Sequence, residues 1–222
     1  MDIASGKKKS ARITADNLAK YLGVPRYTHS ELLDKDEIGV ATGMAWTAAG
    51  GELLPIEVSI LPGKGNLLLT GQLGDVMKES AQMSLSYIRS IWDKLGLEKD
   101  FYEKIDVHIH APEGAVPKDG PSAGVTLVTA MVSALTKRAV RRDIAMTGEM
   151  TLRGKVLPIG GLKEKSLAAY RAGSREIIIP IDNKKDMEEI PAEIREEMTI
   201  HLADNITEVL DWALAAEGSE QK

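Results

Sequence analysis

The segment PKDGPSAGVTLVTAMVSALT, residues 117–136, combines a loop of prolines and glycines with a strongly apolar helix. Pro121 suits the first helical position, because its missing N–H would have no partner there. Ser122 then lies in the first turn, where the backbone N–H groups lack intrahelical acceptors and carry partial positive charge. Such N–H groups also suit an oxyanion hole. Ser122 is therefore either an ordinary helix-start residue or a nucleophile.

The hydroxyl side chains of this helix recur at offsets of four, three and four residues. They are Ser122, Thr126, Thr129 and Ser133. This spacing places them in one stripe on an otherwise apolar helix. The stripe predicts that Ser122 faces something other than the main core.

Outward from this helix, the chain shows alternating strand and helix signals. Upstream lie a hairpin around AAGG (48–51), a short strand in GNLLLTG (65–71), a helix ending at Gly96 and the strand IDVHIHAP (105–112). Downstream lie short strands, a helix closing at Gly173, the buried strand REIIIP (175–180), the edge strand EEMTIHLA (196–203) and a helix capped by Asn205. These signals predict an α/β (α+β) fold with an N-terminal β-meander and a mixed sheet flanked by helices.

Composition narrows the function classes. The 222 residues carry a net charge of −5, so nucleic acid is not expected as a partner of this domain. The absence of cysteine excludes thiolate catalysis and cysteine-bound zinc. No apolar stretch approaches the roughly 20 residues that span a bilayer, and the N-terminus lacks a signal-peptide core. We therefore expect a cytoplasmic protein without membrane contact.

Three regions are expected along the chain. In residues 1–32 the sequence predicts a tail, a short helix and a linker. The helix lies in ITADNLAKYLGVPRY, is capped by Thr14 or Asp16 and ends at Gly23. Residues 33–216 form the main domain, and residues 217–222 a disordered tail.

Two kinds of base could activate Ser122. His108 and His110 share one face of a predicted strand, and Asp119 follows in the loop, so a Ser122–His110–Asp119 triad is open. The same histidines could bind a metal, but no third ligand is evident, and zinc takes three or four. Hydrogen bonding on a partly buried polar face is the simpler interpretation.

A lysine is the other candidate base. Helical geometry places Lys165 in the middle of an apolar face formed by Leu162, Ala168, Ala169 and Ala172. Burial disfavours the charged amine and lowers its pKa, so such a lysine could accept a proton near pH 7. The alternative is a lysine whose stem is buried while its ammonium reaches water.

The motifs PKDGPSAG (117–124) and MTGEMTLRGKVLPIGGLKEK (146–165) closely resemble the proteolytic domain of the bacterial-type (LonA) ATP-dependent Lon protease. The resemblance runs from about residue 33 to about residue 215 and implies a Ser122–Lys165 dyad. It also implies that Thr147 hydrogen-bonds near the lysine. Further positions match the surroundings of the family's active site: Glu57, His108, His110 and Asp119. In inactive forms of the family the loop that carries Asp119 can block the site.

The same resemblance implies a serine endopeptidase acting on unfolded or damaged proteins. The N-terminal helix resembles the end of the helical subdomain of the family's AAA+ ATPase module. No Walker A motif is present, so ATP and magnesium would serve that absent module, and this chain would need no cofactor. The full-length family assembles as homo-hexamers. Two alternatives stay open: a phosphate-binding fold similar to GHMP kinases, and a non-catalytic ring-assembly module.

Overall fold

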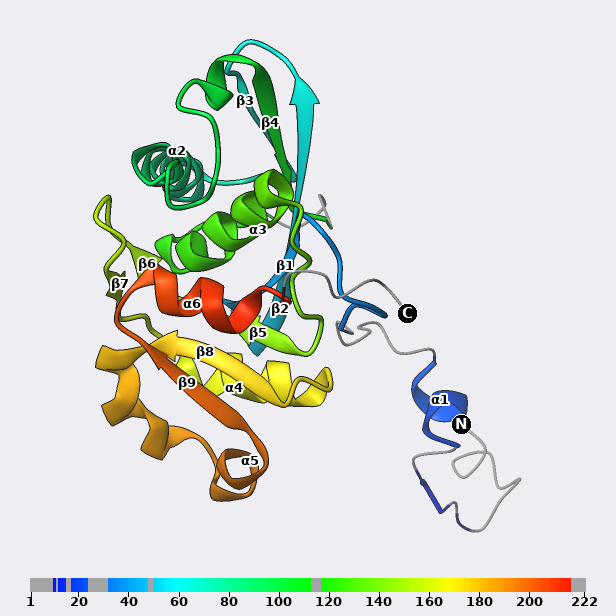
Figure 1. The fold of residues 1–222 in the computed structure, drawn as a ribbon. Coiled ribbons are helices and arrows are strands. Elements are labelled where there is room, and N and C mark those ends of the chain that lie inside the picture. Colours follow the sequence, from blue (N-terminus) through cyan, green and yellow to red (C-terminus); the bar gives the residue numbers. More distant parts are fainter. Residues whose placement is uncertain are drawn as a thin grey trace.

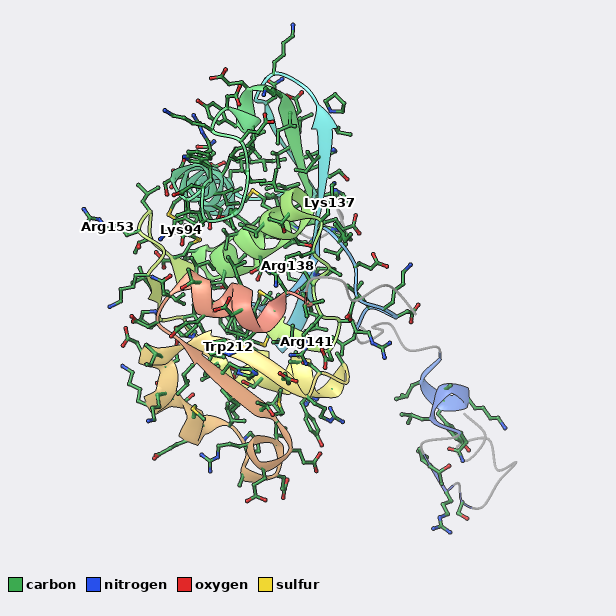
Figure 2. The ribbon with its side chains drawn as sticks, in the orientation of Figure 1. Lys94, Lys137, Arg138, Arg141, Arg153 and Trp212 are labelled. Carbon is green, nitrogen blue, oxygen red and sulfur yellow. The ribbon has the colours of Figure 1, made fainter. Side chains whose placement is uncertain are left out.

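A computed structural model describes residues 10, 12–14, 17–23, 32–47, 50–112 and 117–216 (Figure 1). Its α-helices are α1 (Leu18–Leu22), α2 (Asp75–Ser90), α3 (Gly124–Thr136), α4 (Leu162–Arg171), α5 (Ala192–Glu197) and α6 (Ile206–Ala213). Short 3₁₀ helices are η2 (Phe101–Glu103), η3 (Pro121–Ala123) and η4 (Ile181–Glu189). The strands are β1 (Val40–Thr47), β2 (Gly50–Pro62), β3 (Leu67–Thr70), β4 (Ile105–His110), β5 (Ile144–Met146), β6 (Glu149–Met150), β7 (Val156–Leu157), β8 (Glu176–Pro180) and β9 (Thr199–Ala203).

The main sheet is mixed, as predicted. Within the described residues it has seven strands in the order β3-β4-β2-β1-β5-β8-β9. β1 and β2 form the expected antiparallel hairpin, and β5, β8 and β9 run parallel to one another. β9 lies at one edge, as its mixed pattern predicted. β6 and β7 form a separate two-stranded ribbon.

The expected N-terminal β-meander is wrong in one strand pairing, that of β2 with β3. β3 does not pair with β2, because β4 lies between them, antiparallel to β2 and parallel to β3. Parallel neighbours need a long crossover connection, and α2 supplies it between β3 and β4. The alternation of side chains along a strand shows which face is buried but does not identify the neighbouring strand.

Two apolar cores lie on opposite faces of the sheet. Successive side chains of β8 divide between them: Ile178 joins the core shared with α2, α3 and α6, while Ile177 and Ile179 join the core beneath α4. Figure 1 shows α3 and α6 in front of the sheet and α4 behind it. Cover on both faces explains why β8 reads as a continuous apolar run rather than an alternating one.

The hydroxyl stripe of α3 divides between the cavity and the core. Ser122 faces the cavity, as expected, whereas Thr126, Thr129 and Ser133 are fully buried. Thr129 donates to the carbonyl oxygen of Val125 one turn earlier, and Ser133 accepts the N–H of Gly39 at 2.9 Å. The hydroxyl of Thr126 is buried without a hydrogen-bond partner.

The predicted caps of the first and last helices agree with the structure in part. α1 begins at Leu18 with Asn17 as its N-cap residue, so Thr14 is not the cap, and Asp16 lies outside the described residues. Gly23 ends α1 as predicted, with a φ of 81°. Residues 1–9 of the predicted N-terminal tail, residues 28–31 of the linker and the predicted C-terminal tail, 217–222, lie outside the described residues. α6 has the predicted Asn205 cap, reinforced by Glu208 in a capping box. None of the helices in the described part is both long and apolar enough to span a membrane.

Candidate active site

Ser122 lies in η3, the 3₁₀ turn that leads into α3. Its carbonyl oxygen accepts the N–H of Gly148 at 2.9 Å and the hydroxyl of Thr147 at 3.2 Å. These bonds fasten the serine turn to the chain that leaves β5. Gly124, two residues later, packs closely against β6, because a Cβ added there would lie 3.1 Å from Met150 Cγ. The turn that presents Ser122 is therefore held from outside its own helix.

Lys165 reaches Ser122 from α4. Its side chain is buried, with 3% exposure, and its Nζ lies 3.0 Å from Ser122 Oγ and 3.1 Å from Thr147 Oγ1. Both distances are within hydrogen-bond range. Thr147 thus touches both partners, because its hydroxyl accepts from the amine and donates to the Ser122 carbonyl. The two segments of the sequence that carry Ser122 and Lys165 meet through this threonine.

Burial sets the charge state of Lys165. It lowers the pKa of the amine from 10.5 to about 8, because the charged form loses its hydration. A neutral amine can accept a proton from the Ser122 hydroxyl, and it becomes the main form above that pKa. The lysine that helical periodicity placed on an apolar face is thus a buried amine and does not extend to water.

A glycine contact sets the depth at which α4 lies on the hairpin. A Cβ on Gly51 would lie 2.0 Å from the carbonyl oxygen of Glu164, the residue before Lys165. Any larger residue at position 51 would push the backbone of α4 outward. Gly51 therefore allows Lys165 to come within reach of Ser122.

Ser122 and Lys165 open onto a cavity of about 490 Å³. Its lining comes from the hairpin, the serine loop, β6 and the segment before α4, and includes Met44, Trp46, Glu52, Met77, Lys118, Glu149, Ile159 and Glu164. Half of these side chains are apolar and half are charged, so the cavity combines apolar and polar surface beside the Ser122 hydroxyl. Sequence patterns did not reveal these residues, because they come together only through tertiary packing.

Asp119 lies on the rim of this cavity, but its carboxylate turns toward α2. Its Oδ1 accepts the backbone N–H of Met77 at 3.0 Å and that of Gly120 at 2.9 Å. α2 has Gly74 as its N-cap residue, so the aspartate supplies the side-chain cap that the helix lacks. In this conformation Asp119 holds the serine loop against α2.

Glu57, His108 and His110 lie away from the cavity lining. His108 Nε2 and His110 Nδ1 both contact the hydroxyl of Thr70, at 3.0 and 2.8 Å. Glu57 stands opposite His110 on β2. The structure does not bring Ser122, His110 and Asp119 together as a triad, since the contact of the Ser122 hydroxyl is with Lys165. Across the described ranges, no three His, Cys, Asp or Glu side chains gather as a metal site.

Comparisons with known proteins identify a family. A family model described as the Lon protease (S16) C-terminal proteolytic domain matches residues 12–216. Lon protease 1 of Bacillus subtilis (strain 168) is 56% identical over 97% of the chain, which spans 28% of that relative's length. The Lon protease of Brevibacillus choshinensis is 57% identical over 96% of the chain, spanning 27% of that relative. That of Dictyoglomus thermophilum is 54% identical over 95% of the chain, again spanning 27%.

Proposed function

This chain belongs to the Lon protease (S16) family through its C-terminal proteolytic domain, and we propose that it hydrolyses peptide bonds with Ser122 as nucleophile and Lys165 as general base. The family is one of serine peptidases. The observation that carries the proposal is the 3.0 Å approach of a buried amine, with its pKa lowered to about 8, to the Ser122 hydroxyl. A nucleophile within hydrogen-bond reach of its base is the signature of covalent catalysis.

The proposed reaction follows from these positions. Neutral Lys165 takes the Ser122 proton as Oγ attacks the carbonyl carbon of the substrate. Backbone N–H groups at the start of the serine helix stabilise the oxyanion. The lysine ammonium then protonates the departing amine, and the acyl group remains on Oγ. Water attacks the acyl-enzyme with Lys165 again as base, which releases the second product and restores the serine.

We extend the proposal to substrates and partners. The proposed substrates are unfolded or damaged polypeptides, because a peptide bond must reach Ser122 and Lys165 at the cavity before it can be cleaved. The chain spans 28% of the length of its Bacillus subtilis relative. We therefore assign the unfolding of substrate proteins to an ATPase module in a longer chain, which we propose assembles as a homo-hexamer. ATP and magnesium would act there, while the dyad itself uses no cofactor. The comparisons give no support to a kinase-like or purely structural role.

The direct test of the proposed function is cleavage of an unstructured fluorogenic peptide by the purified chain without ATP. We expect ATP-independent turnover that a peptide boronate blocks by binding at Ser122. A folded protein lacking unstructured segments serves as the control and should stay intact. Absence of turnover together with absence of boronate binding would contradict the proposal.

Peptide cleavage is expected to rise with pH. Lys165 must be neutral to act as base, and its pKa is lowered by burial to about 8. Log kcat/KM should therefore climb with a slope of about one below that pH and level off above it. A pH series with the same peptide measures the midpoint. A flat profile between pH 6 and 9 would exclude Lys165 as the titrating base.

Replacing Thr147 by valine is expected to lower kcat roughly 10- to 100-fold while KM changes little. Valine keeps the shape but removes the hydroxyl that accepts from Lys165 and donates to the Ser122 carbonyl. Thr147→Ser retains the hydroxyl and should recover most of the rate. Steady-state kinetics of the two variants test the point. Loss in Thr147→Ser with wild-type kinetics in Thr147→Val would show that the methyl group, not the hydroxyl, matters.

A further inference from the structure

Asn183 is a buried polar residue whose side chain bonds to the lining of the cavity. It lies in η4 and is 1% exposed. Its Oδ1 accepts the backbone N–H of Ile159 at 2.9 Å, and its Nδ2 donates to the carbonyl oxygen of the same residue at 2.9 Å. The second hydrogen of Nδ2 goes to Asp186 Oδ2 at 2.6 Å. One side chain thus satisfies both backbone groups of Ile159.

Ile159 belongs to the cavity wall, which we define as residues 158–160. These residues line the cavity and connect β7, which ends at Leu157, to α4, which begins at Leu162. Within the described part of the chain, no strand pairs with the wall. The Asn183 amide supplies the two bonds that a neighbouring strand residue would make.

Asp186 fixes the orientation of this amide. A carboxylate accepts but does not donate, so it requires the NH₂ group of Asn183 on its side. That orientation leaves Oδ1 for the N–H of Ile159. An asparagine that served only to fill the core would need no such orienting partner. The pair therefore has the arrangement of a fixed support for one residue of the wall.

We propose that Asn183 is a positioning residue that holds the cavity wall in place for substrate binding. The proposal rests on the proposed peptidase function. Without the amide, the N–H and the carbonyl oxygen of half-buried Ile159 lose their hydrogen-bond partner, and the wall is no longer held in this position. Lys165 is held separately by Thr147 and by the packing of α4 on the sheet. The loss should therefore appear in substrate affinity more than in the chemical step.

Steady-state kinetics of Asn183→Ala test this. We expect KM for the fluorogenic peptide to rise about tenfold, kcat to fall less than about threefold, and the pH midpoint to stay where wild type has it. Asp186→Ala should raise KM by less, because it removes the orientation of the amide but not the amide. An unchanged KM, or a fall in kcat with a shifted pH midpoint, would overturn the assignment.

Asn205→Ala is the matched control for lost stability. Asn205 also bonds to backbone through its side chain, but it caps α6 and does not line the cavity. This variant should lower the melting temperature without raising KM. If Asn205→Ala raises KM as much as Asn183→Ala does, the effect is general loosening and the proposal fails.

Hydrogen exchange gives a readout that does not depend on activity. The Ile159 amide should exchange at least about tenfold faster in Asn183→Ala than in wild type, while amides in β8 keep their protection. Equal exchange at Ile159 would overturn the proposal even if KM changed. If wild type showed no turnover but Ile159 lost protection, the peptidase assignment would fail while the structural support stood.

Discussion

Ser122→Ala is expected to abolish peptide cleavage, lowering kcat by about 10⁴- to 10⁶-fold. Alanine leaves Lys165 and the oxyanion donors in place but removes the nucleophilic oxygen that lies 3.0 Å from the amine. What remains is binding and polarisation of the substrate, which give little rate without a nucleophile. The measurement is turnover of the fluorogenic peptide at pH 8.5, where wild-type Lys165 is mostly neutral. Boronate binding should weaken in parallel, because no hydroxyl is left to form the adduct.

His110→Ala separates this dyad from the histidine triad that the sequence also allowed. His110 contacts Thr70 on the neighbouring strand and does not line the cavity. We expect this variant to keep most of its turnover, losing at most a few-fold through changes in β4. A loss as large as that of Ser122→Ala would restore the triad. Wild-type cleavage by Ser122→Ala would remove the serine from the mechanism altogether.

Local sequence signals predicted most of the elements and singled out Ser122 and Lys165 as candidates. The β1–β2 hairpin, the buried β8 and the capped α6 each follow from turn residues, branched side chains or an N-cap pattern. Lys165 was identifiable because a lysine interrupts an apolar helix face, a pattern that depends on α4 alone. The family resemblance then connected it with Ser122, a link that periodicity could not make.

Features that depend on two distant segments could not be read from local patterns. The position of β4 between β2 and β3 requires the α2 crossover to be placed in space. Gly51 looks like a turn residue, yet its importance lies in contact with the backbone of Glu164. Asn183 stands in a polar stretch with no signal that it would be buried beside the cavity. The burial of Thr126, Thr129 and Ser133 could not be read from the hydroxyl stripe either, because serine and threonine are mostly exposed and only tertiary packing covers them here.

Replacing Lys165 by methionine is expected to remove activity and to raise stability. Methionine keeps the length and fills the buried space but cannot take the Ser122 proton, so kcat should fall by about 10³-fold or more. The stability gain comes from the cost of burying a charge. Below pH 8 wild type carries a protonated Lys165 in the core, and lowering its pKa from 10.5 to about 8 corresponds to about 3 kcal/mol. Lost contacts with Ser122 and Thr147 reduce this net gain to about 2 kcal/mol.

The pH dependence of that gain is its sharpest test. Between pH 8 and 10.5 the unfolded lysine is protonated while the folded one is not, so the unfolded state binds more protons and wild-type stability rises with pH. The methionine variant lacks this rise. Its advantage in urea unfolding should therefore be full at pH 7, fall to zero near about pH 9.5 and become a deficit of about 1 kcal/mol by about pH 10.5. Lys163→Met, at an exposed position of the same helix, should show neither the gain nor the loss of activity. A Lys165→Met variant less stable than wild type at pH 7 would mean that the amine's hydrogen bonds outweigh its desolvation.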